Sequence, residues 1–228
     1  MIGWVLCIGG AYILGSIPFG YLLGRARGLD IRQHGSKNVG ATNVGRVLGR
    51  RLGLICFFLD VSKGAVPVIV AGVLDDLITQ PITSITPLQM WLWLAVACAA
   101  VLGHMHSLFL GLRGGKGVAT GFGAMLAMWP LLTFPALGAM VIWYGMLRLT
   151  RYVSIASMTA SLSLPLWYLV RALPPNATDV ELSQTLARVW QTSPPLIVTT
   201  VLALLIVFKH RTNIARLRSG EEPKSDSS

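Results

Sequence analysis

Residues 52–74 read LGLICFFLDVSKGAVPVIVAGVL, an almost unbroken apolar run. At about 20 residues per crossing, this run is long enough for one transmembrane helix. Working outward, six more apolar runs predict an all-α, polytopic membrane protein with seven transmembrane helices. The predicted spans are residues 3–23, 52–74, 88–110, 118–129, 131–148, 153–171 and 194–209. For residues 118–129 an alternative stays open, namely a half-span buried within the protein.

The composition points the same way. Apolar residues make up 54% of the chain and charged residues 12%, whereas soluble domains carry about 25% charged residues. This excludes a large soluble domain and a disordered chain. We expect a single membrane domain over residues 1–210 and a polar tail over residues 211–228, frayed from Ser219 onward.

Basic residues predict the orientation. The formal net charge is +10, and sixteen of the 19 Lys and Arg residues fall in segments 24–51 and 111–117, the turn near residue 150 and the tail. The positive-inside rule places these segments in the cytoplasm and the N-terminus outside. In a membrane protein such an excess suits membrane lipid or a phosphorylated substrate, so we expect no nucleic-acid partner.

The sequence predicts neither disulfides nor a metal site. Cys7, Cys56 and Cys98 lie far apart in apolar runs, without a CxxC pair, and are interpreted as buried small hydrophobic residues. His104 and His106 are two residues apart and do not share a helical face, so they do not form a metal-binding pair.

The first polar cluster, residues 35–46, reads GSKNVGATNVGR and contains no carboxylate. Its candidate hydrogen-bond donors are Ser36, Asn38, Thr42 and Asn43. Arg46 adds a guanidinium that can hold an anion with two N–H groups. The cluster is typical of a phosphate cradle, and the alternative is an ordinary polar turn followed by a helix cap.

The second cluster is Gly114-Gly115-Lys116-Gly117, at the start of a predicted helix. Glycines at a helix start expose backbone N–H groups that bind anions, and Lys116 adds a positive charge. No Ser or Thr follows Lys116, so the motif is not a nucleotide-binding P-loop and favours a smaller phosphate. The alternative is a glycine-rich turn with one cytoplasmic lysine.

The third cluster is His210, Asn213 and Arg216, assigned to the last helix. Positions 210 and 213 share a helical face, as do 213 and 216. The cluster is either part of a binding site or a basic tail that touches lipid headgroups.

Ionisable residues also occur inside predicted spans. Asp60 and Lys63 are three residues apart and can meet on one helix, where we favour a structural ion pair over a functional one. His104, near the membrane edge, is a candidate base or hydrogen-bond donor. No His–carboxylate pair is expected near the polar loops.

Together these stretches resemble the bacterial acyl-phosphate:glycerol-3-phosphate acyltransferases. The motifs that carry the resemblance are Gly15-Ser16-Ile17-Pro18, residues 35–46, Asp60-Val61-Ser62-Lys63-Gly64, Gly103-His104, residues 114–120, His210, Asn213-Ile214 and Arg216-Leu217. They follow one another in the order of that family. Lys37 stands where a glycine is common, and Ser107 where a proline is common.

The resemblance implies an enzyme of the bacterial inner membrane with its active site on the cytoplasmic side. Such an enzyme transfers a fatty acyl group from acyl phosphate to the 1-hydroxyl of sn-glycerol 3-phosphate. The products are lysophosphatidic acid and phosphate, and the step opens phospholipid synthesis. It uses no cofactor.

The polar clusters and the resemblance together give the candidate site. The expected catalytic residues are Ser36, Asn43, Arg46 and Lys116. The expected substrate-binding residues are Asn38, Thr42, His104, Gly114, Gly115, Gly117, Ser154, His210, Asn213 and Arg216. Glu222 matches a family position that we interpret as structural rather than catalytic.

The main alternative is a membrane transporter for an organic phosphate. A carrier typically has charge at the bilayer midplane and an inverted repeat, whereas here the cations collect at one face and no repeat is visible. A coenzyme A-dependent acyltransferase is disfavoured because none of the four histidines begins a His-x-x-x-x-Asp motif.

Overall fold

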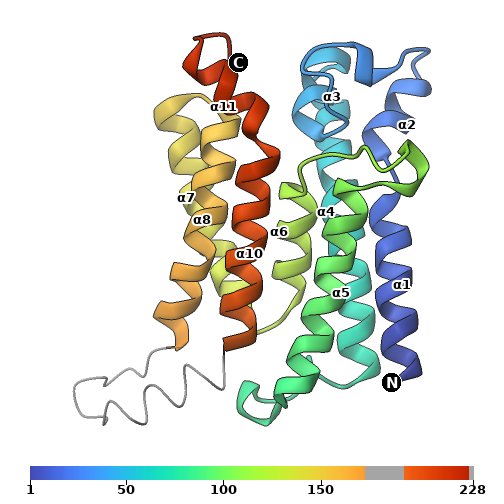
Figure 1. Ribbon diagram of the computed structural model, residues 1–228, viewed down its shortest axis with the longest axis vertical. Helices are drawn as coiled ribbons and strands as arrows, with labels where there is room; N and C mark the ends of the chain where they lie inside the picture. The colour runs from blue at the N-terminus through green and yellow to red at the C-terminus, as the bar shows by residue number, and fades with distance from the viewer. Residues whose placement is uncertain (173–192, 226–228) are drawn as a thin grey trace. The chain divides into compact units, whose positions relative to one another are not determined.

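The computed structural model describes residues 1–172 and 193–225, and within these ranges every regular element is helical (Figure 1). The α-helices are α1 (Ile2–Ser16), α2 (Phe19–Arg25), α3 (Ala41–Leu48), α4 (Arg50–Leu74), α5 (Pro87–Met105), α6 (Val118–Ala127), α7 (Thr133–Thr150), α8 (Val153–Ala172), α10 (Ser193–Lys209) and α11 (Arg211–Arg218). Short 3-10 helices are η1 (Ile31–Gln33), η2 (Ile82–Ser84) and η3 (Leu108–Leu110). The prediction of an all-α membrane protein is confirmed.

Four helical stretches of the described chain are long and apolar enough to cross a membrane: Ile2–Arg25, Arg50–Leu74, Pro87–Leu110 and Val153–Arg171. Helices α10 and α11 make a fifth if this pair, bent by 51°, is one span. Helix α6 has 10 residues, and at 1.5 Å per residue it covers only about half of a hydrocarbon core of about 30 Å. This length fits the half-span alternative for residues 118–129.

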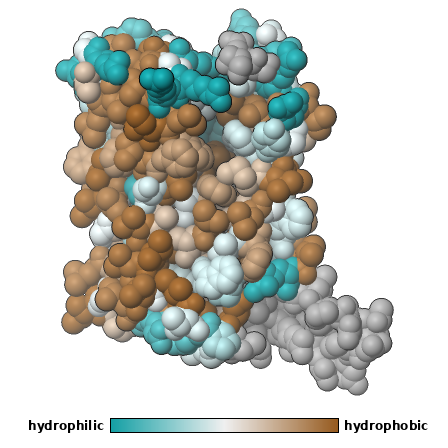
Figure 2. All heavy atoms as spheres, turned by 180° about the vertical axis from the view of Figure 1, so that it is seen from behind, coloured by the Kyte–Doolittle hydropathy of each residue, from teal (hydrophilic) through white to brown (hydrophobic). Residues whose placement is uncertain are grey.

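The helix surfaces are apolar where a soluble protein would be polar. Large hydrophobic side chains such as Phe58, Val73, Val141 and Leu149 are more than 60% exposed. Figure 2 shows hydrophobic side chains over much of the visible helix surface and hydrophilic ones gathered at helix ends. Lipid chains are the environment in which such a surface is stable.

The chain folds into two compact units, one formed by residues 1–79 and 95–128 and the other by 80–94 and the described part of 129–228. Helix α5 contributes its first half to the second unit and the rest to the first. This division concerns packing, and the single domain over residues 1–210 stays a prediction.

Helix α4 organises the first unit, where it packs against α6, α3 and α1. Backbones approach closely at the α4–α6 contact, because a Cβ on Gly64 would overlap the Thr120 carbonyl and one on Gly123 would overlap the Val61 carbonyl. Small residues permit such contacts between membrane helices. Cys56 of α4 is buried as predicted, whereas Cys7 and Cys98 are half-buried.

The first predicted span is broken. Helix α1 ends at Ser16 and α2 begins at Phe19, because Pro18 lacks the N–H that would continue the helix and its ring clashes with the preceding turn. Polar segments 26–49 and 106–117 lie at the same end of this unit, beyond the break (Figure 1).

In the second unit, α8 packs against both α7 and α10. Trp143 Nε1 of α7 donates a hydrogen bond of 3.2 Å to Ser157 Oγ of α8. The sequence interpretation placed His210, Asn213 and Arg216 on one last helix. The structure instead ends α10 at Lys209 and begins α11 at Arg211, with His210 as its N-cap.

Candidate functional site

Asn43 organises the first polar loop. Its side chain is 1% exposed, and Oδ1 accepts a hydrogen bond of 2.7 Å from the Ser36 N–H. Nδ2 lies within hydrogen-bonding distance of three carbonyl oxygens: Ile31 O at 3.3 Å, His34 O at 3.1 Å and Asn38 O at 2.8 Å. The Asn43 amide therefore ties the loop to α3 and orients Ser36.

The rest of the first cluster lies around the start of α3. Asn38 Oδ1 accepts a hydrogen bond of 2.8 Å from the Gly40 N–H, which forms the turn before the helix. Thr42 and Arg46 are exposed on α3 and, four residues apart, share one face. The alternative of a polar turn followed by a helix thus describes the backbone, and this arrangement is compatible with a phosphate cradle.

Two further loop residues explain local features of the sequence. Lys37 has φ of 60°, in the left-handed region that favours glycine, which accounts for the glycine common at this position in the resembling family. Asp30 is paired with Arg32 at 2.6 Å. The hydrogen bonds from the Arg32 guanidinium lower the pKa of this carboxyl to about 2, so both groups stay charged.

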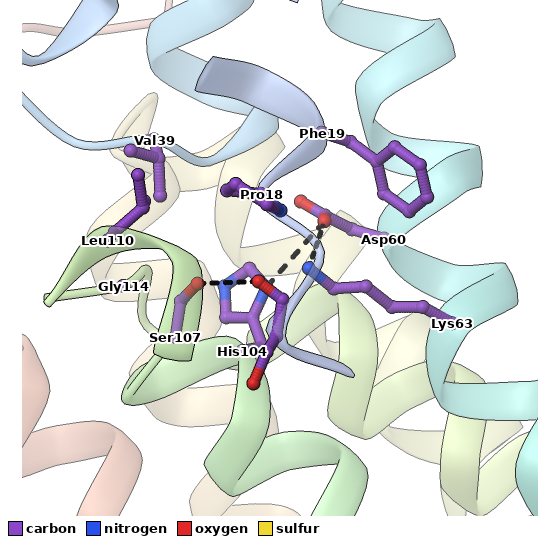
Figure 3. Close-up of a pocket in the computed structure, with 10 residues that line it drawn as sticks. Pro18, Phe19, Val39, Asp60, Lys63, His104, Ser107, Leu110 and Gly114 are labelled. Carbon is purple, nitrogen blue, oxygen red and sulfur yellow. Dashed lines mark hydrogen bonds and ion pairs between the residues drawn. The ribbon is translucent and has the colours of Figure 1, made fainter. Parts of the chain in front are cut away.

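An apolar cluster joins the first loop to the segment that carries the second polar cluster. Its buried members are Ile31, Val39, Val44, Cys56 and Leu110. Val39 and Leu110 also line a small hollow together with Gly114 (Figure 3). The structure therefore brings the first two polar clusters to one region of the first unit.

The glycine loop folds back over the end of α5. The Gly114 N–H donates to Met105 O at 3.2 Å and the Gly115 N–H donates to His104 O at 3.0 Å. Both N–H groups are thus bonded to carbonyls at the end of α5, contrary to the prediction that these glycines present them to an anion. Gly117, with φ of 83°, is the N-cap of α6, and the first N–H groups of that helix have no partner within it. Half-buried Lys116 lies beside this helix start.

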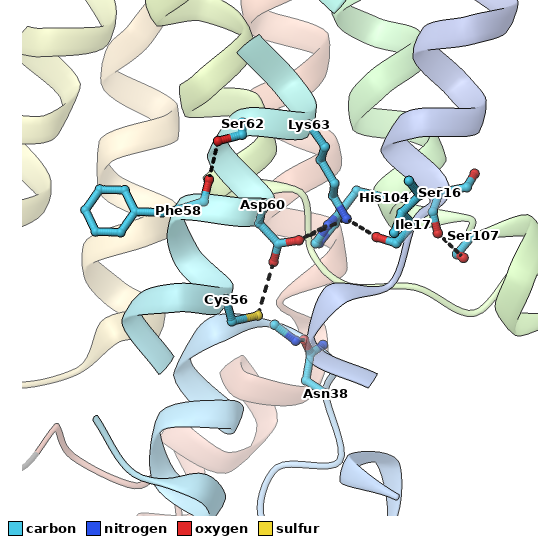
Figure 4. Close-up of polar contacts among 11 residues, drawn as sticks. Ser16, Ile17, Asn38, Cys56, Phe58, Asp60, Ser62, Lys63, His104 and Ser107 are labelled. Carbon is cyan, nitrogen blue, oxygen red and sulfur yellow. Dashed lines mark hydrogen bonds and ion pairs between the residues drawn. The ribbon is translucent and has the colours of Figure 1, made fainter. Parts of the chain in front are cut away.

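Three ionisable side chains form a buried cluster beneath the loop (Figures 3 and 4). Lys63 Nζ is 2.9 Å from Asp60 Oδ1, which confirms the predicted contact between these residues. His104 Nδ1 is 3.6 Å from the same oxygen. The expectation of no His–carboxylate pair near the polar loops is therefore wrong. Asp60 and His104 lie on different helices, so local spacing carried no signal of their contact.

The third cluster lies in the second unit and is joined by a residue of the tail. Glu222, only 7% exposed, accepts 2.6 Å and 2.8 Å hydrogen bonds from Asn213 Nδ2 and Arg216 Nε. His210 Nδ1 is 2.8 Å from Ile206 O. Ser154, at the start of α8, is also buried.

The prediction of a tail frayed from Ser219 onward is wrong for the described residues 219–225. Besides the contacts of Glu222, the Ser225 N–H donates to Arg151 O at 2.7 Å, and Lys224 Nζ lies 5.8 Å from the centre of the Tyr152 ring. These contacts hold Lys224 and Ser225 against the turn between α7 and α8, and Glu222 against α11. A buried carboxylate with two hydrogen-bond donors cannot be recognised from a polar tail composition.

Replacing Glu222 with glutamine is expected to destabilise the protein and to flatten its response to acid. Burial alone raises the pKa of this carboxyl, but the hydrogen bonds from Asn213 and Arg216 outweigh burial and hold the pKa below its usual value. The contribution of Glu222 to stability is therefore complete above its unfolded pKa and lost as the pH falls through the folded pKa.

Thermal unfolding in detergent, measured from about pH 7 down to about pH 3, tests this prediction. At neutral pH, Glu222→Gln should lower the free energy of unfolding by about 1.5–3 kcal/mol, the usual value of a hydrogen bond to a charged group. The matched control is Glu221→Gln, because Glu221 is exposed. Equal acid sensitivity of Glu222→Gln and the unaltered protein would contradict the prediction.

Comparisons with known proteins bear on this site. A family model described as glycerol-3-phosphate acyltransferase matches residues 5–220. The chain is 42% identical to the glycerol-3-phosphate acyltransferase of Geobacter sulfurreducens, over 93% of this chain and 92% of that protein. It is 38% identical to that of Aquifex aeolicus, over 93% and 94%.

Two solved structures are also similar. The crystal structure of PlsY, an integral membrane glycerol 3-phosphate acyltransferase, in its glycerol 3-phosphate form superimposes with a TM-score of 0.78 at 35% identity. The lysophosphatidic acid form gives a TM-score of 0.76 at 35% identity. Each comparison covers 97% of this chain and 95% of the other chain.

Proposed function

Because the chain belongs to the glycerol-3-phosphate acyltransferase family, we propose that it transfers a fatty acyl group from acyl phosphate to the 1-hydroxyl of sn-glycerol 3-phosphate. The products are lysophosphatidic acid and inorganic phosphate. The observation that carries this proposal is the similarity, over 97% of the chain, to an acyltransferase solved with glycerol 3-phosphate and with lysophosphatidic acid. These ligands correspond to the acceptor and the product of the proposed reaction.

The proposed setting is the bacterial inner membrane, with seven spans and the active site on the cytoplasmic side. The spans are α1 with α2, α4, α5, the short α6, α7, α8 and α10. The clustering of Lys and Arg in segments 24–51 and 111–117, in the turn near residue 150 and in the tail supports this orientation and an N-terminus outside.

Cationic side chains are proposed to bind the phosphoryl groups. Both substrates are phosphorylated, so the site must compensate several negative charges. Arg46, exposed on α3, and Lys116, beside the start of α6, carry that charge in the first unit. Ser36, Asn38 and Thr42 add hydrogen-bond donors from the same loop and helix.

For the second unit, substrate binding by Ser154, His210, Asn213 and Arg216 stays a prediction that the family resemblance supports. Within that unit, Glu222 sets the orientations of Asn213 and Arg216. Asn43, expected to be catalytic, is better described as a positioning residue because the four hydrogen bonds of its side chain go to loop backbone.

The chemistry needs no covalent enzyme intermediate, because an acyl phosphate is already an activated mixed anhydride. The glycerol hydroxyl oxygen bonds to the acyl carbon, and the bond between that carbon and the phosphate oxygen breaks. The hydroxyl proton passes to the leaving phosphate. Orientation of the two substrates and stabilisation of the developing oxyanion by cations and hydrogen-bond donors supply the rate.

The acyl chain is proposed to lie among the apolar helices. Each buried CH₂ group contributes roughly 0.8 kcal/mol of binding free energy. The acyl chain is therefore bound mainly through its hydrocarbon tail, while the polar groups orient the acyl phosphate group. A soluble scaffold would have to bury this tail by itself, whereas a bundle in a bilayer can accept it directly from the membrane.

The test is an assay with purified protein in detergent, supplied with palmitoyl phosphate and sn-glycerol 3-phosphate. Lysophosphatidic acid and phosphate should form in equal amounts without ATP, coenzyme A or added metal. Palmitoyl coenzyme A in place of palmitoyl phosphate is the control donor and should give no product. Uptake of glycerol 3-phosphate into vesicles without acyl transfer would instead identify a carrier.

A further inference from the structure

The buried cluster of Asp60, Lys63 and His104 has no part in the reaction as proposed above. The three side chains are 2%, 3% and 6% exposed. Two basic residues meet one carboxylate oxygen, Asp60 Oδ1, at 2.9 Å and 3.6 Å. Removing charged groups from water is costly unless they are paired, so a cluster of this kind fixes its members in one arrangement.

On one side, the cluster contacts the connection between α1 and α2 in the first span. Lys63 Nζ donates a hydrogen bond of 2.7 Å to Ile17 O, the carbonyl next to Pro18 (Figure 4). The same ammonium lies 5.6 Å from the centre of the Phe19 ring. Lys63 therefore joins α4 to the point where α1 passes into α2.

The other side of the cluster supports the glycine loop. The His104 carbonyl accepts the Gly115 N–H, and a Cβ on Gly115 would overlap the His104 imidazole at Nε2. A Cβ on Gly114 would overlap the His104 carbonyl oxygen. The loop backbone thus rests directly on His104, and only glycine fits at these two positions.

A second contact fixes the base of the same segment. Ser107 Oγ donates a hydrogen bond of 2.5 Å to Ser16 O (Figure 4), and Ser107 O accepts the Leu112 N–H at 2.8 Å. The segment between α5 and α6 is therefore anchored at both ends, at Ser107 and at His104, with Lys116 directly after the glycines that contact His104.

We propose that Asp60 is a positioning residue for the reaction, which acts through His104 to hold residues 114–117 and so sets the location of the Lys116 ammonium. This inference rests on the proposed function. Asp60 Oδ1 lies 3.6 Å from the imidazole Nδ1, a distance of electrostatic contact, and the Nε2 side of the ring lies against Gly115. Asp60 itself, buried in α4, does not touch substrate.

The physical reason is the sensitivity of catalysis to position. A displacement of about 1 Å in a group that binds the reacting phosphate can cost up to about 100-fold in rate. Glycines allow the close contact with His104, but they leave the loop backbone without side chains to pack. A fixed imidazole beneath the loop compensates for that lack.

The first test measures the loop itself, without reference to activity. Hydrogen–deuterium exchange at the Gly114 and Gly115 amides is compared in the unaltered protein, Asp60→Asn and Ser62→Ala. Ser62 is the matched control, because it is exposed on the same helix and its hydroxyl bonds only to Phe58 O. We expect exchange about tenfold faster in Asp60→Asn and unchanged exchange in Ser62→Ala.

The second test measures coupling to Lys116. Asp60→Asn should lower kcat/KM at least about tenfold in the unaltered background and by much less in the Lys116→Ala background, because both changes act on the same group. Equal fold losses in the two backgrounds would overturn the proposal. An unaltered protein without acyl transfer would refute the proposed function, while the exchange experiment would still decide the positioning role.

His104→Gln is the second variant, which removes the ring beneath Gly115 and keeps Asp60. It should show the same faster exchange. Unchanged exchange in both variants would refute the inference. Loss of folded protein in both would also refute it, because the cluster would then support the whole unit rather than the loop.

Discussion

Lys116→Ala is expected to lower kcat/KM about 100- to 1000-fold, the usual loss when one group that stabilises developing negative charge is removed. Lys116 is half-buried beside the N-terminal end of α6, where the helix dipole also favours an anion. The reaction places two phosphoryl groups in one site, so the loss of a cation there should weaken both binding and turnover. Steady-state kinetics with both substrates varied measures the effect.

Two further variants make this result specific. Lys116→Arg keeps the charge but changes its geometry, and it should recover part of the activity. Arg113→Ala removes an exposed cation from the same segment and should stay within about threefold of the unaltered enzyme, since kcat/KM reports only groups that stabilise the transition state. If Lys116→Ala lowered kcat/KM no more than Arg113→Ala does, Lys116 would contribute only to the positive charge that orients the protein in the membrane.

Asn43→Ala is expected to destabilise the first loop by about 3 kcal/mol and to abolish most activity. The substitution removes the two amide N–H donors, which are shared among three backbone carbonyls, and the acceptor for the Ser36 N–H, and each of these three net hydrogen bonds contributes about 1 kcal/mol. Because the Asn43 amide positions Ser36, a disordered first loop should also displace Ser36 from the proposed active site. Thermal unfolding and kcat/KM are the measurements.

The matched control is Asn38→Ala. The Asn38 side chain makes one of the loop's hydrogen bonds, from the Gly40 N–H, so it should cost about 1 kcal/mol. Asn43→Asp retains the acceptor for Ser36 but points a carboxylate at three carbonyl oxygens, and it should be at least as harmful as Asn43→Ala. Equal, small effects of Asn43→Ala and Asn38→Ala would contradict the assigned role.

Local patterns in the sequence were sufficient for most of the helices. Apolar runs long enough to cross a bilayer predicted α4, α5, α8 and α10 to within a few residues, because membrane helices bury their backbone polar groups within a single segment. The Asp60–Lys63 contact was equally accessible, since residues three apart on one helix are neighbours.

Short helices and tail contacts were not accessible in this way. Helix α3 within the first polar loop and the new helix that begins at Arg211 have little apolar signal, because they lie outside the spans. The role of Glu222 depends on the tail folding back onto α11. The sequence around a carboxylate in a polar tail does not indicate which amide or guanidinium it will bind in the folded protein.

The family motifs and most of the apolar spans could thus be read from the chain alone, because hydropathy and residue order are properties of the chain. Whether a polar group faces a substrate or the protein's own backbone depended on the folded structure. Asn43 has the chemistry of a substrate ligand but binds loop carbonyls, and His104 acquires its carboxylate partner from another helix. Hydrogen-bond partners are selected by three-dimensional proximity, and folding brings together groups that are remote in sequence.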